Sequence, residues 1–178
     1  VSGGLHGVGL SCVNALSDWL VADVYRNCKA YTIRFDRGVT VDPLRELGPT
    51  TKRGTRVSFK PDGTNFPDTV YVWDILAKRL RELAFLNSGI RITLTDERLE
   101  EGQTTGRSET FHYEGGIREF VSMLNVNKTV INPDVIYFHR ERNGIDVEVA
   151  MQYNDGTAEN IYSYANNINT IEGGSHLT

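Results

Sequence analysis

Residues 1–17 read VSGGLHGVGLSCVNALS, with four glycines at positions 3, 4, 7 and 9. Apolar residues then recur with a helical period over residues 10–20, so the glycines directly precede a predicted helix. Glycine lets the backbone approach a ligand closely, and the free N–H groups at a helix start favour an anion such as a triphosphate. The spacing is neither that of a Walker loop nor that of the dinucleotide fingerprint. Taken alone, the pattern leaves a structural turn and a phosphate loop both open.

Composition and charge exclude several classes of protein. The 178 residues are 39% hydrophobic and 24% charged, which is typical of a globular chain. The formal net charge of −4 gives no support for a surface that grips nucleic acid by itself. No apolar run reaches the ~20 residues that cross a bilayer, so no membrane contact is expected. The two cysteines, Cys12 and Cys28, are too few for a disulfide framework and fit a reducing cytoplasm.

Patterning predicts a mixed α/β first part and a strand-dominated second part. Helical periods predict helices over residues 10–20, 73–84 and 117–124. Strand-like runs occupy residues 19–26, 30–36, 54–59, 90–95, 135–140, 145–153 and 159–165. Residues 43–52 and 97–109 are predicted to be loops. Turn residues predict hairpins at 27–29, at Asn143-Gly144 and at 154–156.

Several side chains have a plain structural interpretation. Cys12 lies on the apolar side of its helix and is predicted to be a core thiol. The stripe over residues 73–84 is predicted to be core, and its cations Lys78, Arg79 and Arg81 are predicted to form a solvated face. Asn125, Asn127, Asn166 and Asn167 are expected to serve turns and caps. No metal site is expected, because His112, His139 and His176 have no partners at metal-ligand spacing.

The glycine-rich stretch, followed by Val13-Asn14-Ala15-Leu16-Ser17, resembles the ATP lid of type IIA DNA topoisomerase ATPase subunits, the family of DNA gyrase and topoisomerase IV. The resemblance continues in order and covers essentially the whole chain. It includes residues 76–89, 111–117, 125–128, 147–150, 154–156, 166–168 and 173–177. It leaves gyrase and topoisomerase IV both open.

The resemblance implies an α+β fold in two pieces. Residues 1–116 would be the C-terminal half of a GHKL-type ATPase sandwich, and residues 117–178 would begin an S5-like transducer domain. The family uses ATP and Mg²⁺, dimerises on binding ATP, captures DNA and works with a gyrase A-like subunit as a cytoplasmic heterotetramer. Because the chain opens at Val1 inside a motif and stops without a closing element, we expect an internal fragment of a longer protein.

The resemblance also implies which residues hold ATP. Backbone amides of residues 5–9 would cradle the β- and γ-phosphates, Thr55 would lie near the adenine, and Arg26 would stand at the pocket rim, where it suits larger ligands that compete with ATP. The full expected set is Gly3, Gly4, Leu5, His6, Gly7, Val8, Gly9, Thr55 and Arg26. His6 is expected to act through its backbone.

No catalytic or metal-binding residue is assigned within the chain. The family's general-base glutamate, magnesium-binding asparagine and adenine-reading aspartate would lie upstream of Val1, and its transducer lysine beyond Thr178. The segment alone is therefore expected not to hydrolyse ATP, because the attacking water needs a positioned base.

Two other functions compete with the topoisomerase hypothesis. One is a MutL-like or chaperone-like ATP-driven clamp, against which the pattern of residues 71–116 argues. The other is a non-catalytic α+β interaction module, in which the glycine stretch is only a turn. Stabilisation by nucleotide would separate this module from an ATPase.

Overall fold

The computed structural model describes residues 8–99, 106–171 and 173. The chain divides between Val70 and Tyr71 into two compact units. The domain boundary expected after residue 116 does not coincide with this division. That boundary stays a prediction.

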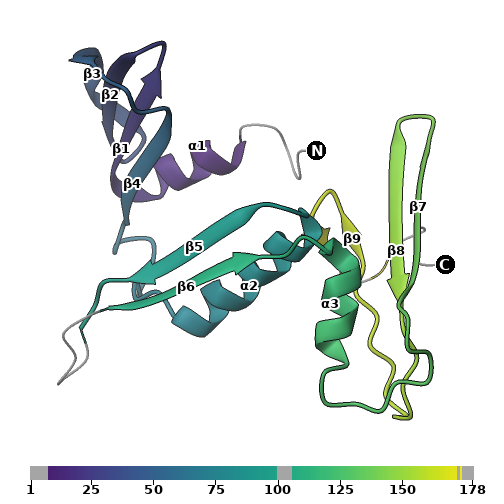
Figure 1. Ribbon diagram of the computed structural model, residues 1–178. Helices are drawn as coiled ribbons and strands as arrows, with labels where there is room; N and C mark the ends of the chain where they lie inside the picture. The colour runs from purple at the N-terminus through teal and green to yellow at the C-terminus, as the bar shows by residue number, and fades with distance from the viewer. Residues whose placement is uncertain (1–7, 100–105, 172, 174–178) are drawn as a thin grey trace. The chain divides into compact units, whose positions relative to one another are not determined.

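The first unit is one helix followed by a four-stranded antiparallel sheet (Figure 1). The helix α1 spans Val8–Ala15, and the sheet has the order β3-β2-β1-β4. The strands are β1 (Ser17–Arg26), β2 (Lys29–Asp36), β3 (Val39–Pro49) and β4 (Gly54–Pro61). The tight turn between β1 and β2 places Asn27 and Cys28 at φ of 55° and 59°, which confirms the hairpin predicted there.

One face of the sheet is more apolar than the other, and side chains alternate between the two faces along each strand. Val24 of β1 pairs with Tyr31 of β2 on one side and with Thr55 of β4 on the other. The apolar face repeats this arrangement at Leu20, Ala22, Ile33, Phe35, Val57 and Phe59. The opposite face is mixed: it contains Val21 and Tyr25 as well as polar residues, and there Thr32 donates a 2.7 Å hydrogen bond to Asp23.

Three expectations for this unit were wrong. The helix ends at Ala15, since Trp19 and Leu20 of the expected helical run belong to β1. Most of the expected loop at 43–52 is strand β3. The pairing of β3 with β2 contains register shifts, and Gly48 lies at a φ of 116°. The sequence of β3 therefore lacks the regular alternation of apolar and polar residues that predicts a strand. Cys12 is exposed rather than buried, because no residue of α1 is buried in this unit.

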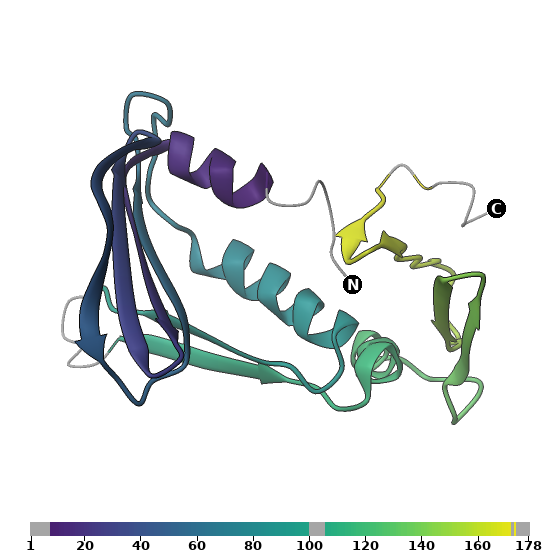
Figure 2. The ribbon, with the colours of Figure 1, turned by 90° about the horizontal axis from the view of Figure 1, so that it is seen from above.

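The second unit begins with a helix packed along a hairpin. Figures 1 and 2 both show α2 (Trp73–Leu86) lying beside β5 (Arg91–Asp96) and β6 (Arg107–His112). Its core contains Trp73, Ala77, Ala84 and Phe111, with Leu80, Ile92, Leu94 and Tyr113 packed against them. The predicted apolar stripe of α2 is thereby confirmed, and Asn87 ends the helix as expected.

Aromatic stacking joins α3 (Gly116–Leu124) to α2. The ring of Phe85 in α2 lies 3.6 Å from that of Tyr113 and 5.0 Å from that of Phe120 in α3, measured between centroids. Phe85 is only 2% exposed. The helices α2 and α3 therefore share one core.

The remaining strands are short hairpins. Strands β7 (Ile136–Arg142) and β8 (Ile145–Met151) are joined by Asn143 and Gly144, both with positive φ, as predicted. Strands β9 (Tyr164–Ala165) and β10 (Ile168–Asn169) flank the Asn166-Asn167 turn. The strand expected at 159–165 exists only at its last two residues. The hairpin expected at 154–156 is instead a local turn, in which the Gly156 N–H donates to the Asn154 side chain over 2.9 Å.

The cations of α2 are not a uniformly solvated face. Arg79 pairs with Glu82 at 3.2 Å and donates to the Asn167 carbonyl at 2.9 Å. Arg81 pairs with Glu109 at 2.7 Å, and Glu109 lies in β6 although it was expected in a loop. The expectation holds for Lys78, which is exposed.

No helix within the described ranges is long and apolar enough to span a membrane.

Candidate functional site

Two of the expected site residues lie on the same face and at the same end of the first sheet. Thr55 pairs with Val24, and Arg26 follows Val24 by two residues, so Arg26 and Thr55 extend the apolar face of β1 and β4. Both are exposed. The arrangement offers an apolar surface for a flat ring, a hydroxyl that can donate or accept a hydrogen bond, and a cation at the rim.

Gly54 explains why a Gly-Thr pair stands at this edge. Its φ of 132° lies in a region that side chains rarely adopt, and the chain makes this turn as it enters β4. A residue with a Cβ would be strained there even though the space is open. The glycine thereby places the Thr55 hydroxyl at the start of an edge strand.

The glycine-rich stretch lies mostly outside the described residues. Gly3, Gly4, Leu5, His6 and Gly7 belong to the part that is not described, whereas Val8 and Gly9 open α1. The prediction that the glycines lead into a helix agrees with this start. Their contact with phosphates stays a prediction.

A buried carboxylate that the sequence analysis did not single out lies just after β4. Asp62 accepts hydrogen bonds from the Thr64 N–H at 2.9 Å, the Thr64 hydroxyl at 2.8 Å and Arg37 Nε at 2.7 Å. The Thr64 N–H, then Arg37, lowers the pKa of Asp62 to about 2. The Pro61-Asp62-Gly63 sequence indicated only a turn, because the partner Arg37 is distant in the chain.

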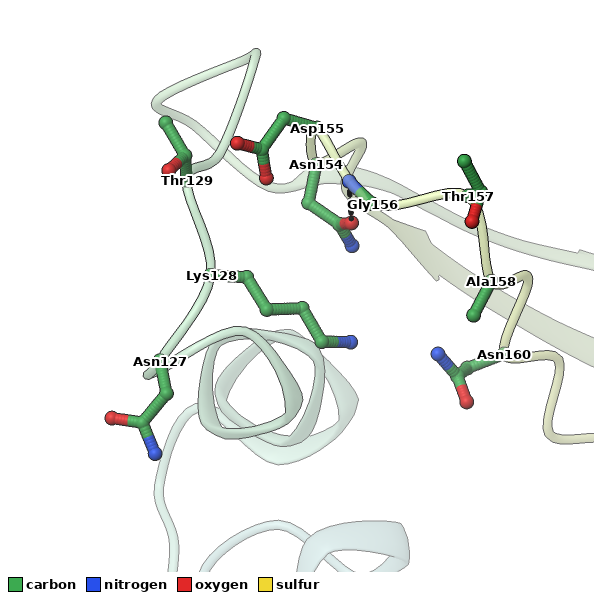
Figure 3. Close-up of a pocket in the computed structure, with 9 residues that line it drawn as sticks. All are labelled: Asn127, Lys128, Thr129, Asn154, Asp155, Gly156, Thr157, Ala158 and Asn160. Carbon is green, nitrogen blue, oxygen red and sulfur yellow. Dashed lines mark hydrogen bonds between the residues drawn. The ribbon is translucent and has the colours of Figure 1, made fainter.

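The second unit contains an open polar pocket of about 450 Å³. Its lining consists of Asn127, Lys128, Thr129, Asn154, Asp155, Gly156, Thr157, Ala158 and Asn160. Figure 3 shows the Lys128 side chain reaching across it toward Asn160. The lining contains one lysine and one aspartate, so neither sign of charge dominates in the pocket. The sequence predicts no ligand for this pocket.

Within residues 8–99, 106–171 and 173, no three His, Cys, Asp or Glu side chains gather as a metal-ligand group. His112 is hydrogen-bonded to the Ile90 carbonyl at 3.0 Å, and His139 to Asp146 at 2.6 Å. His176 lies outside the described residues. The expectation that the Mg²⁺ ligands lie outside this segment stays a prediction.

Comparisons of the sequence identify close relatives. A family model described as DNA gyrase B matches residues 116–178. The chain is 52% identical over 177 residues to the DNA gyrase B protein of Halalkalibacterium halodurans, and the match covers 99% of this chain and 27% of that protein. It is 54% identical over 181 residues to the DNA gyrase B protein of Chitinophaga japonensis, with 99% of this chain and 38% of that protein covered. The chain thus spans well under half the length of these relatives.

Solved structures agree with the fold. The 43K ATPase domain of Thermus thermophilus gyrase B, crystallised in complex with an aminocoumarin, matches 97% of this chain with a TM-score of 0.84 and 35% identity, and the match covers 46% of that domain. The gyrase B protein of Myxococcus xanthus matches 94% of this chain, and 48% of its own, with a TM-score of 0.82 at 24% identity, which bears on the fold alone. The expected α+β fold is thereby confirmed.

Proposed function

Because this chain belongs to the DNA gyrase B family of type IIA topoisomerase subunits, we propose that it forms part of the region that binds ATP in a DNA topoisomerase. The placement of Thr55 and Arg26 on one apolar face carries the proposal. This face belongs to the same unit as α1, the helix that the glycine-rich stretch opens.

We propose that the segment binds a nucleotide in the following way. The adenine packs on the apolar face of the sheet beside Val24 and Val57, and the Thr55 hydroxyl hydrogen-bonds the base directly or through water. Backbone amides of residues 5–9 hold the β- and γ-phosphates at the start of α1. Arg26, at the rim, contacts larger ligands that compete with ATP.

The chemistry needs groups from outside this segment. Mg²⁺ supplies charge neutralisation to the triphosphate when it is bound. We propose that its protein ligands and the general base belong to other parts of the full-length protein, and that this segment binds and orients ATP without hydrolysing it alone.

The whole protein then couples ATP hydrolysis to DNA strand passage. We propose that it acts in the cytoplasm with DNA and a gyrase A-like subunit, and that its ATPase regions dimerise on binding ATP. Because this chain has a net charge of −4, we propose that most of the contact with DNA is made by other parts of that assembly. The gyrase B relatives favour this function over a MutL-like clamp.

A substitution of Thr55 tests the proposal in the full-length protein. Thr55→Val keeps the shape and removes the hydroxyl, and we expect the Kd for ATP, measured by calorimetry, to rise about tenfold, within the ~1–3 kcal/mol cost of an unpaired polar group. Thr95→Val is the matched control, because the Thr95 hydroxyl lies on an exposed strand pair with Ser108. Equal affinities in wild type and Thr55→Val would argue against this adenine contact.

A second measurement separates an ATPase from an interaction module. Binding of ATP at 100 times its Kd is expected to stabilise the full-length protein by about 2.7 kcal/mol, seen as a rise in melting temperature. Absence of any nucleotide-dependent shift would favour the non-catalytic module.

A further inference from the structure

A small hairpin late in the chain lies against the helix α2 (Figure 1). Its strands β9 and β10 pair through two residues each, Tyr164 with Asn169 and Ala165 with Ile168. A two-stranded ladder of this length is not stable by itself in water. The position of the hairpin in its unit therefore depends on contacts outside the ladder.

The turn of this hairpin is held on α2 by polar contacts. Arg79 donates a 2.9 Å hydrogen bond to the Asn167 carbonyl. The Asn167 side-chain amide donates to Asn87 Oδ1 over 3.0 Å, and the Asn87 amide donates to the Leu83 carbonyl over 2.8 Å. One turn residue is thereby fixed both from the middle of α2 and from its C-terminal end.

These contacts can be exchanged for water. A hydrogen bond that solvent can replace contributes little net free energy, because water takes the place of the lost partner. The Arg79 side chain is 42% exposed and also pairs with Glu82, so its guanidinium stays solvated and paired when it releases Asn167. The hairpin thus has the properties of an element that opens locally while its unit stays folded.

A buried hydroxyl without an acceptor opposes docking of the hairpin. Tyr164 Oη is buried and has no hydrogen-bond partner among the residues that the structure describes. Burial raises the pKa of Tyr164 to about 12, and the charge of Glu82 in α2 adds to the rise, so the hydroxyl stays protonated. An unpaired buried donor destabilises the state that buries it. Tyr164 therefore favours release of the hairpin, whereas Arg79 and Asn87 favour docking.

The two sides of this contact are distant in the chain. Arg79 and Asn167 are 88 residues apart. The helix α2 is the first element after β4, the strand that carries Thr55 of the proposed nucleotide site. The hairpin follows residue 116, after which a second domain is expected. The contact thus joins the ATPase side of the chain to the part expected to respond to it.

We propose that the β9–β10 hairpin, residues 164–169, is a latch on α2, and that Arg79 and Asn87 are positioning residues that couple the nucleotide site to the part of the protein beyond residue 116. With the latch docked, a displacement of α2 carries the hairpin with it; with the latch released, it does not. The latch moves as one element, because its sheet consists of these two strands. This inference rests on the proposed function, in which ATP hydrolysis drives strand passage.

Hydrogen exchange of the full-length protein, resolved by peptide, measures docking of the latch. Asn167→Gly keeps a residue that tolerates the φ of 67° and removes the amide bound to Asn87. We expect exchange of the amides of residues 163–170 to rise about tenfold. Asn166→Gly is the matched control, since it makes the same change one position earlier, at a φ of 50° and on an exposed side chain, and is expected to leave exchange unchanged.

Tyr164→Phe tests the opposing contribution. It removes the unpaired hydroxyl and keeps the ring, so exchange of the latch is expected to slow by about threefold. Loss of a hydroxyl that only stabilised the hairpin would speed exchange instead.

Coupling is measured with the full-length protein, its gyrase A-like subunit, ATP and closed circular DNA. In Asn167→Gly and Arg79→Met, we expect kcat and KM for ATP to stay within about twofold and the linking-number change per ATP hydrolysed to fall about threefold. A loss of folded protein would lower both activities in proportion and leave that ratio unchanged, so the ratio separates coupling from stability.

Each outcome decides the proposal. Unchanged exchange in Asn167→Gly, exchange that is not slowed in Tyr164→Phe, or an unchanged ratio in both coupling variants would overturn it. A wild type that hydrolyses no ATP would overturn the proposed function and the coupling together, while exchange would still report docking. Should Arg79→Met not fold, Arg79→Lys, which keeps the charge beside Glu82 but loses the planar fork, is expected to lower the ratio about twofold.

Discussion

Replacing Phe85 by alanine removes the ring that joins α2 to α3. The side chain is 2% exposed and stacks on Tyr113 and Phe120. A buried phenylalanine removes about 200 Å² from water, which at ~25 cal/mol per Å² is an upper bound of about 5 kcal/mol. We therefore expect a loss of about 4 kcal/mol in the stability of the second unit, close to the middle of the range for buried Phe→Ala changes.

Hydrogen exchange of the full-length protein, resolved by peptide, measures this loss where it occurs. A cost of about 4 kcal/mol raises the opening equilibrium roughly a thousandfold. Amides of α2, β5, β6 and α3 are expected to lose protection together, and those of β1–β4 to keep it, because the chain divides after Val70.

An exposed phenylalanine of the same unit is the control. Phe138 is 58% exposed, so Phe138→Ala is expected to cost under about 1 kcal/mol. Retention of wild-type protection in α3 while α2 loses its own would refute the reasoning. That result would instead favour separate folding on either side of residue 116.

Three further outcomes follow from local features. Cys28→Gly is expected to stabilise the first unit by about 1 kcal/mol in chemical denaturation, since Cys28 has a φ of 59°, and an unchanged midpoint would contradict this. The pKa of Asp62 is lowered from 3.8 to about 2, so the ionised carboxylate contributes stability above pH 4 that is lost as the pH falls toward 2. The melting temperature of Asp62→Asn is therefore expected to fall less than that of wild type over this range. Asn125→Ala removes the two hydrogen bonds that this buried side chain makes to Gln152 Oε1 and Asn154 Nδ2, and it is expected to cost about 1–3 kcal/mol, seen as faster exchange in α3; unaltered exchange would disprove it.

Elements with a strong local signal were predicted well from the sequence. The periodic stripe of α2, its stop at Asn87 and the Asn143-Gly144 hairpin each depend on residues adjacent in the chain. Strand β3 was missed because proline, glycine and irregular pairing interrupt its alternation. The strand expected at 159–165 has the right composition but pairs only at its end.

Features that depend on distant partners could not be predicted locally. Helical periodicity placed Cys12 on an apolar stripe, but burial depends on what packs there, and in its own unit nothing buries it. Arg79 finds its partner at Asn167, and Arg37 finds Asp62, across long stretches of chain. The family resemblance supplied Arg26 and Thr55, and only the register of β1 and β4 shows that they share a face.

The division of the chain after Val70 separates its two tryptophans. Trp19 lies in β1, and Trp73 begins α2, where the guanidinium of Arg107 lies 4.3 Å from its ring centroid. Each unit therefore carries its own intrinsic fluorophore, one on a half-buried strand and one in a core beneath a cation. Replacing either tryptophan by phenylalanine leaves one tryptophan in this chain, whose emission reports on a single unit. The order in which the two units melt can then be followed without an added label.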